Sequence, residues 1–254
     1  MHEKNDVTNK FEDDFCLVIP IYKQYPTYNE KKALKNIKEK FGDYNIKIIA
    51  PEKLLLNEYD FLKGDIIYFS KKYFKDTKSY SKLLLKKAFY DRFTDYCYMV
   101  IVQPDVWIIQ DNIKLDVFTK YDYVGAPWYE GISLYYFQIR GSRFIPGLIR
   151  HFKTVYVGNG GFCLRNINAC RRLLKKYWVC ARCWKLNEDA FFAFFGSIDN
   201  SFKVAPISVA EQFSLEMEAE QKIKNKKIIP IGVHAWEKWY PQLLDDINDS
   251  DKGR

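Results

Sequence analysis

Long apolar segments are missing from this sequence of 254 residues. No run approaches the roughly 20 apolar residues that a membrane-spanning helix needs, so no such helix is expected. Residues 1–14 are polar and acid-rich, whereas a secretory signal peptide carries an apolar stretch. We therefore expect a cytoplasmic protein with a flexible N-terminus over residues 1–14.

Cysteine and histidine are also scarce. The six cysteines show no regular spacing, which argues against a disulfide scaffold and favours a reducing compartment. Of the three histidines, His2 and His151 have no organised sequence context. Because no internal repeat or low-complexity linker divides the chain, we expect a single domain over residues 15–240, followed by an acidic C-terminal tail over residues 241–254.

Positive charge is in excess, with a formal net charge of +8 at neutral pH. Such an excess favours an acidic partner, which would be nucleic acid, a sugar nucleotide or an anionic membrane surface. The many lysines beside Ile, Asn and Tyr would also arise from compositional bias without any selection for binding. Aromatic residues make up 17% of the chain, and their rings stack on sugars and bases as well as filling cores. Composition alone therefore leaves the ligand open.

Short apolar runs alternate with helical patterns along the chain. Strands are predicted over 15–22, 45–50, 65–69, 96–102, 123–127, 202–205 and 228–233, and helices over 29–40, from 79 or 81 to 93, over 166–177, from 187 onward and over 207–219. This alternation without an early hairpin favours right-handed crossovers between parallel strands. We expect an α/β fold with a mainly parallel central sheet flanked by helices and with its ligand at the carboxyl ends of the strands.

Carboxylates occur at two positions suited to chemistry. Gln103-Pro104-Asp105 follows the most continuous apolar strand, where a carboxylate can reach a metal or a phosphate, although this motif taken alone favours a surface turn. Asn187-Glu188-Asp189 opens a strongly apolar helix. Acidic residues there complement the helix N-terminus, and the same placement holds a carboxylate rigidly, as a general base requires. The pattern does not choose between these two interpretations.

His234 follows the last predicted strand, in the segment Gly232-Val-His-Ala-Trp236. An imidazole at a strand end can complete a metal site that Asp105 begins. A structural histidine with satisfied hydrogen bonds is the alternative.

Several segments together resemble a known family. YDYVGAPW over 121–128, VGNGGFCLR over 157–165, NED over 187–189, FKVAP over 202–206 and GVHAW over 232–236 occur in the order seen in an uncharacterised family of glycosyltransferase-like domains. That family accompanies enzymes of polysaccharide biosynthesis and looks like the GT-A class of nucleotide-sugar transferases, which is Rossmann-like. The resemblance covers about residues 15–240.

The resemblance implies a nucleoside-diphosphate-sugar donor and a divalent cation, Mn²⁺ or Mg²⁺, held by Asp105 and His234. The chain departs from the Asp-x-Asp element of GT-A enzymes, because Gln103 replaces its first Asp. Tyr80 and Lys82 stand at a predicted helix start that faces the strand ends, where amides and an ammonium can meet the diphosphate, and a capped surface helix is the competing explanation. The donor-binding residues expected are Pro20, Tyr22, Tyr80, Lys82, Gln103 and Asp105.

The same resemblance makes the pair Glu188 and Asp189 catalytic, with Asp189 as the base of an inverting transfer to a glycan or lipid-linked acceptor. Glycines without Cβ atoms let the backbone approach an acceptor sugar, and tryptophan rings can stack on it, whereas a tight hairpin turn and buried packing are the alternatives. The acceptor-binding residues expected are Trp128, Asn159, Gly160, Gly161 and Trp236. The charge adds peripheral contact with the anionic inner membrane surface, and no motif that reads nucleic acid specifically is visible. The alternative is a non-catalytic module that binds carbohydrate or nucleic acid on a decayed transferase fold.

Overall fold

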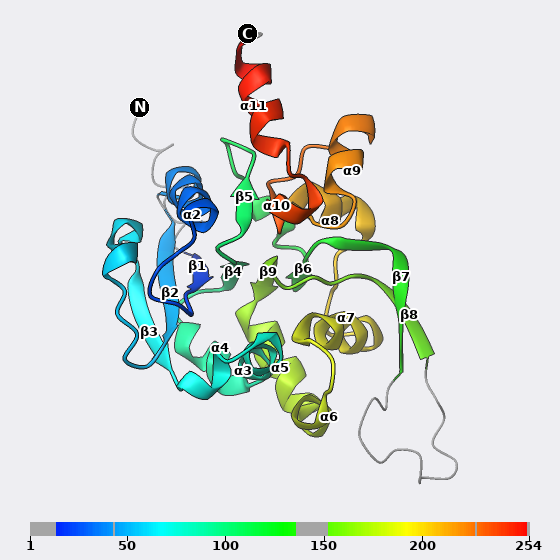
Figure 1. Cartoon of the computed structure of the whole chain (residues 1–254). Helices are drawn as coiled ribbons and strands as arrows, with labels where there is room; N and C mark the ends of the chain where they lie inside the picture. The colour runs from blue at the N-terminus through cyan, green and yellow to red at the C-terminus, as the bar shows by residue number, and fades with distance from the viewer. Residues whose placement is uncertain (1–13, 43, 136–151, 227, 253–254) are drawn as a thin grey trace, which may run out of the picture.

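A six-stranded sheet forms the centre of the computed structural model, which describes residues 14–42, 44–135, 152–226 and 228–252. The strand order is β3-β2-β1-β4-β9-β6 (Figure 1). The strands are β1 (Phe15–Pro20), β2 (Asn45–Pro51), β3 (Asp65–Phe69), β4 (Tyr98–Val102), β6 (Tyr123–Val124) and β9 (Phe162–Asn166). β1 to β4 pair in parallel, and β9 runs antiparallel to both of its neighbours. The expected α/β fold with a mainly parallel sheet is confirmed.

The central strands are buried on both faces. Along β1, Cys16 and Val18 contact one apolar cluster while Leu17 and Ile19 contact another on the opposite face. A strand covered on both faces has no exposed side that favours polar residues. This explains why the sequence shows a continuous apolar run here instead of an alternating pattern.

Helices cover both faces of the sheet (Figure 1). On one face lies α2 (Tyr28–Lys40), which begins with a capping box between Thr27 and Glu30. The opposite face is covered by α3 (Thr77–Leu84), α4 (Lys87–Tyr90), α5 (Ile167–Lys176), α6 (Trp178–Cys183) and α7 (Glu188–Ile198). Short 3₁₀ turns over Asn57–Leu62, Lys71–Tyr73, Asp91–Phe93 and Asp116–Phe118 connect these elements.

Two smaller sheets extend the molecule. One has the order β10-β11-β5, and the other is the antiparallel pair β7-β8. Their strands are β5 (Val106–Ile108), β7 (Pro127–Tyr135), β8 (Phe152–Val157), β10 (Ser214–Leu215) and β11 (Gly232–His234). Four helices accompany the second half: α8 (Ile207–Phe213), α9 (Ala219–Lys226), α10 (Trp236–Trp239) and α11 (Leu243–Lys252).

The strand order reverses between β1 and β4, since the chain adds β2 and β3 on one side of β1 and β4 on the other. Ligands of open α/β sheets bind in the crevice at such a switch point, outside the carboxyl ends of the strands. The segments that follow β1 and β4 carry Tyr22 and Asp105 respectively. The topology therefore brings two of the predicted site segments to the same edge of the sheet.

Some predicted elements differ from the structure. The helix expected to begin at Ser79 or Ser81 begins at Thr77, because Asp76 accepts a hydrogen bond from the Ser79 amide and caps it. Residues 202–205 form no strand beyond a single bridge between Tyr123 and Val204. The helix expected over 207–219 ends at Phe213, where the chain enters β10.

The C-terminal tail is more ordered than its acidic composition suggests. Residues Leu243–Lys252 form α11, and Leu243 is buried in an apolar cluster with Trp236 and Tyr240. The Tyr240 hydroxyl donates to Asp246 at 2.7 Å. The flexible N-terminus predicted over 1–14 falls almost entirely outside the described residues. Among the helices that are described, none is long and apolar enough to cross a membrane.

Candidate functional site

The His234 imidazole is surrounded by oxygen atoms of three residues from two other segments. Its Nδ1 lies 2.8 Å from Glu216 Oε2, and its Nε2 lies 3.1 Å from Gln103 Oε1 and 3.4 Å from Asp105 Oδ1. β11 positions the histidine, and the turn after β4 positions Gln103 and Asp105. The structure therefore brings together the two residues predicted to share a metal.

The electrostatics of this cluster depend on what occupies the space at Nε2. When Glu216 accepts the Nδ1 proton, Nε2 faces two oxygens, of Gln103 and Asp105, that cannot donate a proton to it. Burial opposes charge on the imidazole, but the hydrogen bonds to Asp105 and Glu216 raise its pKa to about 10. Burial likewise opposes charge on Asp105, but the contact with His234 holds the pKa of that carboxyl below its usual range. The imidazole is therefore either doubly protonated or free to bind a cation through Nε2.

The donor set of this cluster fits a hard divalent cation. Two ligands each about 2.1 Å from an octahedral cation lie about 3 Å apart, which is close to the separations of His234 Nε2 from Gln103 Oε1 and Asp105 Oδ1. Glu216 on the far nitrogen is the type of partner that fixes the tautomer of a metal-bound histidine. Across the described residues, however, no three His, Cys, Asp or Glu side chains gather as a metal site. A third protein ligand would have to be the Gln103 amide oxygen.

A glycine loop over residues 158–161 packs against His234 and Glu188. A Cβ atom on Gly161 would lie 2.2 Å from two atoms of the His234 ring, and a Cβ atom on Gly160 would lie 2.5 Å from Glu188 Oε1. The Gly161 carbonyl also accepts a hydrogen bond from the Gln103 amide at 2.9 Å. Both glycines are buried, and their missing Cβ atoms leave the space that the side chains of His234 and Glu188 occupy. The prediction that Gly160 and Gly161 expose their backbone to an acceptor is therefore wrong, because both residues are buried beneath these side chains.

Replacing Gly161 with alanine should therefore displace His234. Since no rotation of a methyl group relieves contacts of 2.2 Å, we expect a loss of about 1–3 kcal/mol in the free energy of unfolding, which is typical of overpacking a buried site. Urea denaturation monitored by circular dichroism measures this loss. Gly42→Ala is the comparison and should cost less, because its nearest contact, 3.3 Å from the Lys38 carbonyl oxygen, needs a shift of only a few tenths of an ångström.

Glu188 occupies a buried ion pair. Its Oε1 lies 3.0 Å from Arg165 Nη2, its Oε2 accepts a hydrogen bond from the Ser81 hydroxyl, and the residue is only 5% exposed. Arg165 is fully buried, donates to the Tyr90 hydroxyl at 2.8 Å and lies 4.9 Å from the Phe192 ring centroid. With both oxygens engaged, Glu188 anchors the start of α7 and is placed as a structural partner of Arg165.

Asp189 is less engaged than its neighbour. It is partly exposed, and its Oδ1 accepts a hydrogen bond from the Ala190 amide at 2.6 Å. Burial raises the pKa of this carboxyl to about 7, with a further contribution from the negative charge of Glu188. A carboxyl with such a pKa can accept a proton near neutral pH, as general bases do.

A cavity of about 290 Å³ opens at the switch point of the sheet. Pro20 lines it from the last position of β1, Tyr22 from beyond β1, Gln103 from beyond β4 and Tyr80 from α3. Among the described residues the buried Tyr80 hydroxyl has no hydrogen-bond partner, and a buried polar group of this kind usually has one. The structure thus gathers four of the residues predicted to bind the donor around one cavity.

Lys82 and Trp236 lie apart from the places predicted for them. Lys82 is exposed on α3 and lines a different groove, because the turn of the helix that carries Tyr80 toward the cavity directs Lys82 away from it. Trp236 is 4% exposed and packs 5.7 Å from the Trp107 ring, so it belongs to the core and cannot stack on an acceptor.

Trp128 and Asn159 remain partly exposed beside the glycine loop. The Trp128 ring covers Gly158, where a Cβ atom would come within 1.9 Å of the ring. Asn159 adopts a left-handed backbone conformation with φ of 55°, which asparagine tolerates better than most residues. Of the five residues predicted to bind the acceptor, these two keep exposed surface.

Glu216 and Arg165 are functional neighbours that the sequence pattern does not single out. Glu216 lies between β10 and α9 and reaches His234 only because β10 pairs with β11. Arg165 stands at the end of an apolar strand, where a charged residue ordinarily faces solvent. The only local signal is the position of Arg165 in the VGNGGFCLR segment.

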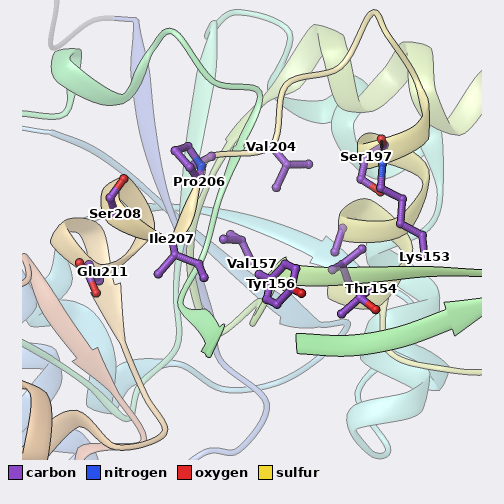
Figure 2. A pocket seen from close by; sticks show the side chains of 13 residues that line it. Lys153, Thr154, Tyr156, Val157, Ser197, Val204, Pro206, Ile207, Ser208 and Glu211 are labelled. Atoms are coloured by element: carbon purple, nitrogen blue, oxygen red, sulfur yellow. Dashed lines mark hydrogen bonds between the residues drawn. The ribbon is translucent and has the colours of Figure 1, made fainter. Parts of the chain in front are cut away.

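A second hollow lies beside the site, between β8 and the chain that enters α8 (Figure 2). It has a volume of about 710 Å³ and is lined by Tyr156, Val157, Val204 and Ile207, among others. Val157 directly precedes the glycine loop. None of the residues predicted for the site lines this hollow, so it is separate from the donor cavity.

Comparison with known proteins defines the class of the fold. The crystal structure of the galactosyltransferase LgtC in complex with donor and acceptor sugar analogues is similar over 92% of this chain and 95% of that chain, with a TM-score of 0.52 and 12% sequence identity. The fold is therefore that of the GT-A glycosyltransferases. The family described as "Protein of unknown function (DUF5672)" matches residues 63–234, and the chain belongs to this family. No curated protein matches the sequence significantly.

Proposed function

We propose that this protein is a glycosyltransferase that moves a sugar from a nucleoside diphosphate to a hydroxyl group of a carbohydrate acceptor, glycan or lipid-linked. The observation that carries the proposal is the convergence of Gln103, Asp105 and His234 beside a cavity at the switch point of the sheet. A site at this edge suits a nucleotide ligand. The similar structure, LgtC, was solved with donor and acceptor sugar analogues.

The nucleotide part of the donor occupies the cavity lined by Pro20, Tyr22 and Gln103 in this proposal. The Tyr22 ring is half exposed and presents an aromatic face to a base. The unpartnered Tyr80 hydroxyl would donate to a donor oxygen and so gain the hydrogen bond that the protein alone does not supply. Donor binding then stabilises the protein through groups that are already in place.

A divalent cation, Mn²⁺ or Mg²⁺, would be held by Asp105, His234 and the amide oxygen of Gln103. When bound, such a cation neutralises negative charge on a diphosphate leaving group. Glu216 holds the imidazole in place at 2.8 Å and leaves Nε2 directed at Asp105. The chain thus supplies one full negative charge where GT-A enzymes supply two, so the donor itself must provide more of the cation's ligands.

Asp189 is the base in this mechanism. It takes the proton of an acceptor hydroxyl as that oxygen forms a bond to the anomeric carbon, while the bond from this carbon to the diphosphate oxygen breaks and the nucleoside diphosphate leaves. Attack opposite the leaving group inverts the anomeric configuration. Arg165 and Glu188 hold the first turn of α7 rigid behind Asp189. Trp128 and Asn159 provide the acceptor with a partly exposed ring and amide.

Substituting Asp105 by alanine should abolish the cation-dependent part of nucleotide binding. For the parent, a nucleoside diphosphate at 100 times its dissociation constant adds about 2.7 kcal/mol to stability, which raises the melting temperature by about 5–10 °C. A thermal-shift panel of UDP, GDP, CDP and ADP, with and without MnCl₂, measures this rise. Asp60→Ala, which removes an exposed carboxylate elsewhere, is the matched control.

An Asp105→Ala variant that responds to nucleotide and Mn²⁺ as the parent does would show that the cation does not lie at Asp105. If no nucleotide stabilises the parent with or without Mn²⁺, the transferase proposal itself fails. The non-catalytic alternative, which the glutamine at position 103 favours, predicts nucleotide or glycan binding without sugar transfer.

A further inference from the structure

A basic groove runs along the helical face of the molecule and belongs to no part of the site described above. It lies among α3, α4, α5 and α6, has a volume of about 1040 Å³ and is lined by seven lysines and Arg182. The single acidic residue in its wall is Asp76, whose carboxylate accepts the Ser79 amide hydrogen at 2.7 Å as the cap of α3. Lys87 pairs with Asp91 at 2.7 Å, and the remaining cations leave the groove with a strong excess of positive charge.

Three of its cations come from three different helices. Lys78 lies on α3, Lys175 on α5 and Arg182 on α6, and all three are exposed. Within the part of the chain that the structure describes, none of the three has a carboxylate within ion-pair distance. α4 contacts both α3 and α5, and α5 contacts α6, so the helices hold these charges in one surface (Figure 1).

Exposed apolar side chains stand directly beside these cations. Trp178, in the wall of the groove, is 60% exposed, and the adjacent Val179 is 48% exposed. Tryptophan is enriched where proteins meet the headgroup region of a bilayer, because its ring is apolar and its N–H remains hydrated. Lysine and arginine around such a ring favour anionic lipids. A polyanion in solution would use the charges but leave Trp178 and Val179 exposed to water.

We propose that this groove, with Trp178 and Val179 at its edge, is the surface by which the protein docks on an anionic phospholipid bilayer. Lys75 and Asp76 line both the groove and the donor cavity, so docking brings the donor cavity near the membrane surface. The proposal does not depend on the proposed transferase activity, because the groove contains neither Asp105, Asp189 nor His234.

The test is sedimentation with vesicles of phosphatidylcholine, with and without phosphatidylglycerol. We expect binding only to the vesicles that contain phosphatidylglycerol, weakening as the salt concentration rises past about 0.15 M. The combined variant Lys78→Gln, Lys175→Gln and Arg182→Gln should bind about a hundredfold more weakly, since each cation near an anionic surface contributes about fivefold. The combined variant Lys35→Gln, Lys63→Gln and Lys114→Gln removes the same charge from other exposed positions and should retain most of the binding.

Tryptophan fluorescence provides an independent readout. Vesicles should shift the emission of the parent to shorter wavelength, and this shift should be lost in Trp178→Phe. If both combined variants lost vesicle binding equally, binding would depend only on net charge, and the proposal would be overturned. Failure of the parent to sediment, or RNA that binds more tightly than vesicles through the same three cations, would also overturn it. Unchanged melting temperatures would show that the variants fold.

Discussion

Asp189→Asn is expected to lower the rate of sugar transfer by about two to four orders of magnitude while nucleotide affinity stays unchanged. A general base contributes to the chemical step by about this factor, and it contributes little to donor binding in the ground state. Asparagine keeps the size of the side chain and can still hydrogen-bond an acceptor, but it cannot take its proton. Transfer from labelled nucleotide sugars, beside nucleotide binding by calorimetry, measures both quantities.

The pH dependence of the parent follows from the same carboxyl. Burial and Glu188 raise the pKa of Asp189 to about 7, and the base acts only when it is ionised. The rate should therefore fall as the pH is lowered through about 7, and this limb should be absent from the residual activity of Asp189→Asn. A rate that is independent of pH between 5 and 8 would contradict the assignment.

The raised pKa has an opposite consequence for stability. A carboxyl whose pKa is higher in the folded protein than in the unfolded chain binds more protons when folded, so stability falls as the pH rises from about 4 to about 7. Asp189→Asn removes this penalty and should be more stable than the parent at pH 8, with the difference shrinking toward pH 4. Asp95→Asn, at an exposed position before β4, is the control and should change neither activity nor stability. An inactive but destabilised Asp189→Asn would indicate a structural role.

The local sequence is enough to predict at which edge of the sheet the site lies. Continuous apolar runs predict β1 and β4, and parallel strands bring their carboxyl ends together. Tyr22 and Gln103 therefore meet at one cavity although they are 81 positions apart in the chain (103 − 22). His234 also follows an apolar run, and the structure brings its Nε2 to 3.4 Å from Asp105 Oδ1.

The side chains that hold these site residues in place reach them through tertiary contacts, which a local sequence pattern does not contain. Glu216 reaches His234 through the pairing of two strands of only two and three residues, β10 and β11. The glycines were interpreted as an opening toward an acceptor, whereas the structure fills that space with His234 and Glu188. The burial of Trp236 and the packing of α11 could not be predicted either. Whether a tryptophan or an acidic helix is buried depends on which distant segments pack against it.

Arg165→Met should cause a large loss of stability, about 3–5 kcal/mol in the free energy of unfolding. Breaking a buried ion pair from one side leaves the other charge, here Glu188, buried and uncompensated. The substitution also removes the hydrogen bond from Arg165 to the Tyr90 hydroxyl. Urea denaturation measures the loss, and Tyr25→Phe, at an exposed position, serves as the control.

The companion variant Glu188→Gln distinguishes two roles for this glutamate. An acidic residue that only complements a helix N-terminus contributes about 0.3–1 kcal/mol, whereas the partner of a fully buried Arg165 should contribute about 3–5 kcal/mol. In the double variant, Glu188→Gln with Arg165→Met, neither charge is left alone, so we expect it to be more stable than the sum of the two single losses predicts. Strictly additive losses would show that the two side chains do not interact. A loss below about 1 kcal/mol for Glu188→Gln would show that Glu188 only complements the helix N-terminus, and a catalytic role beside Asp189 would then have to be considered again.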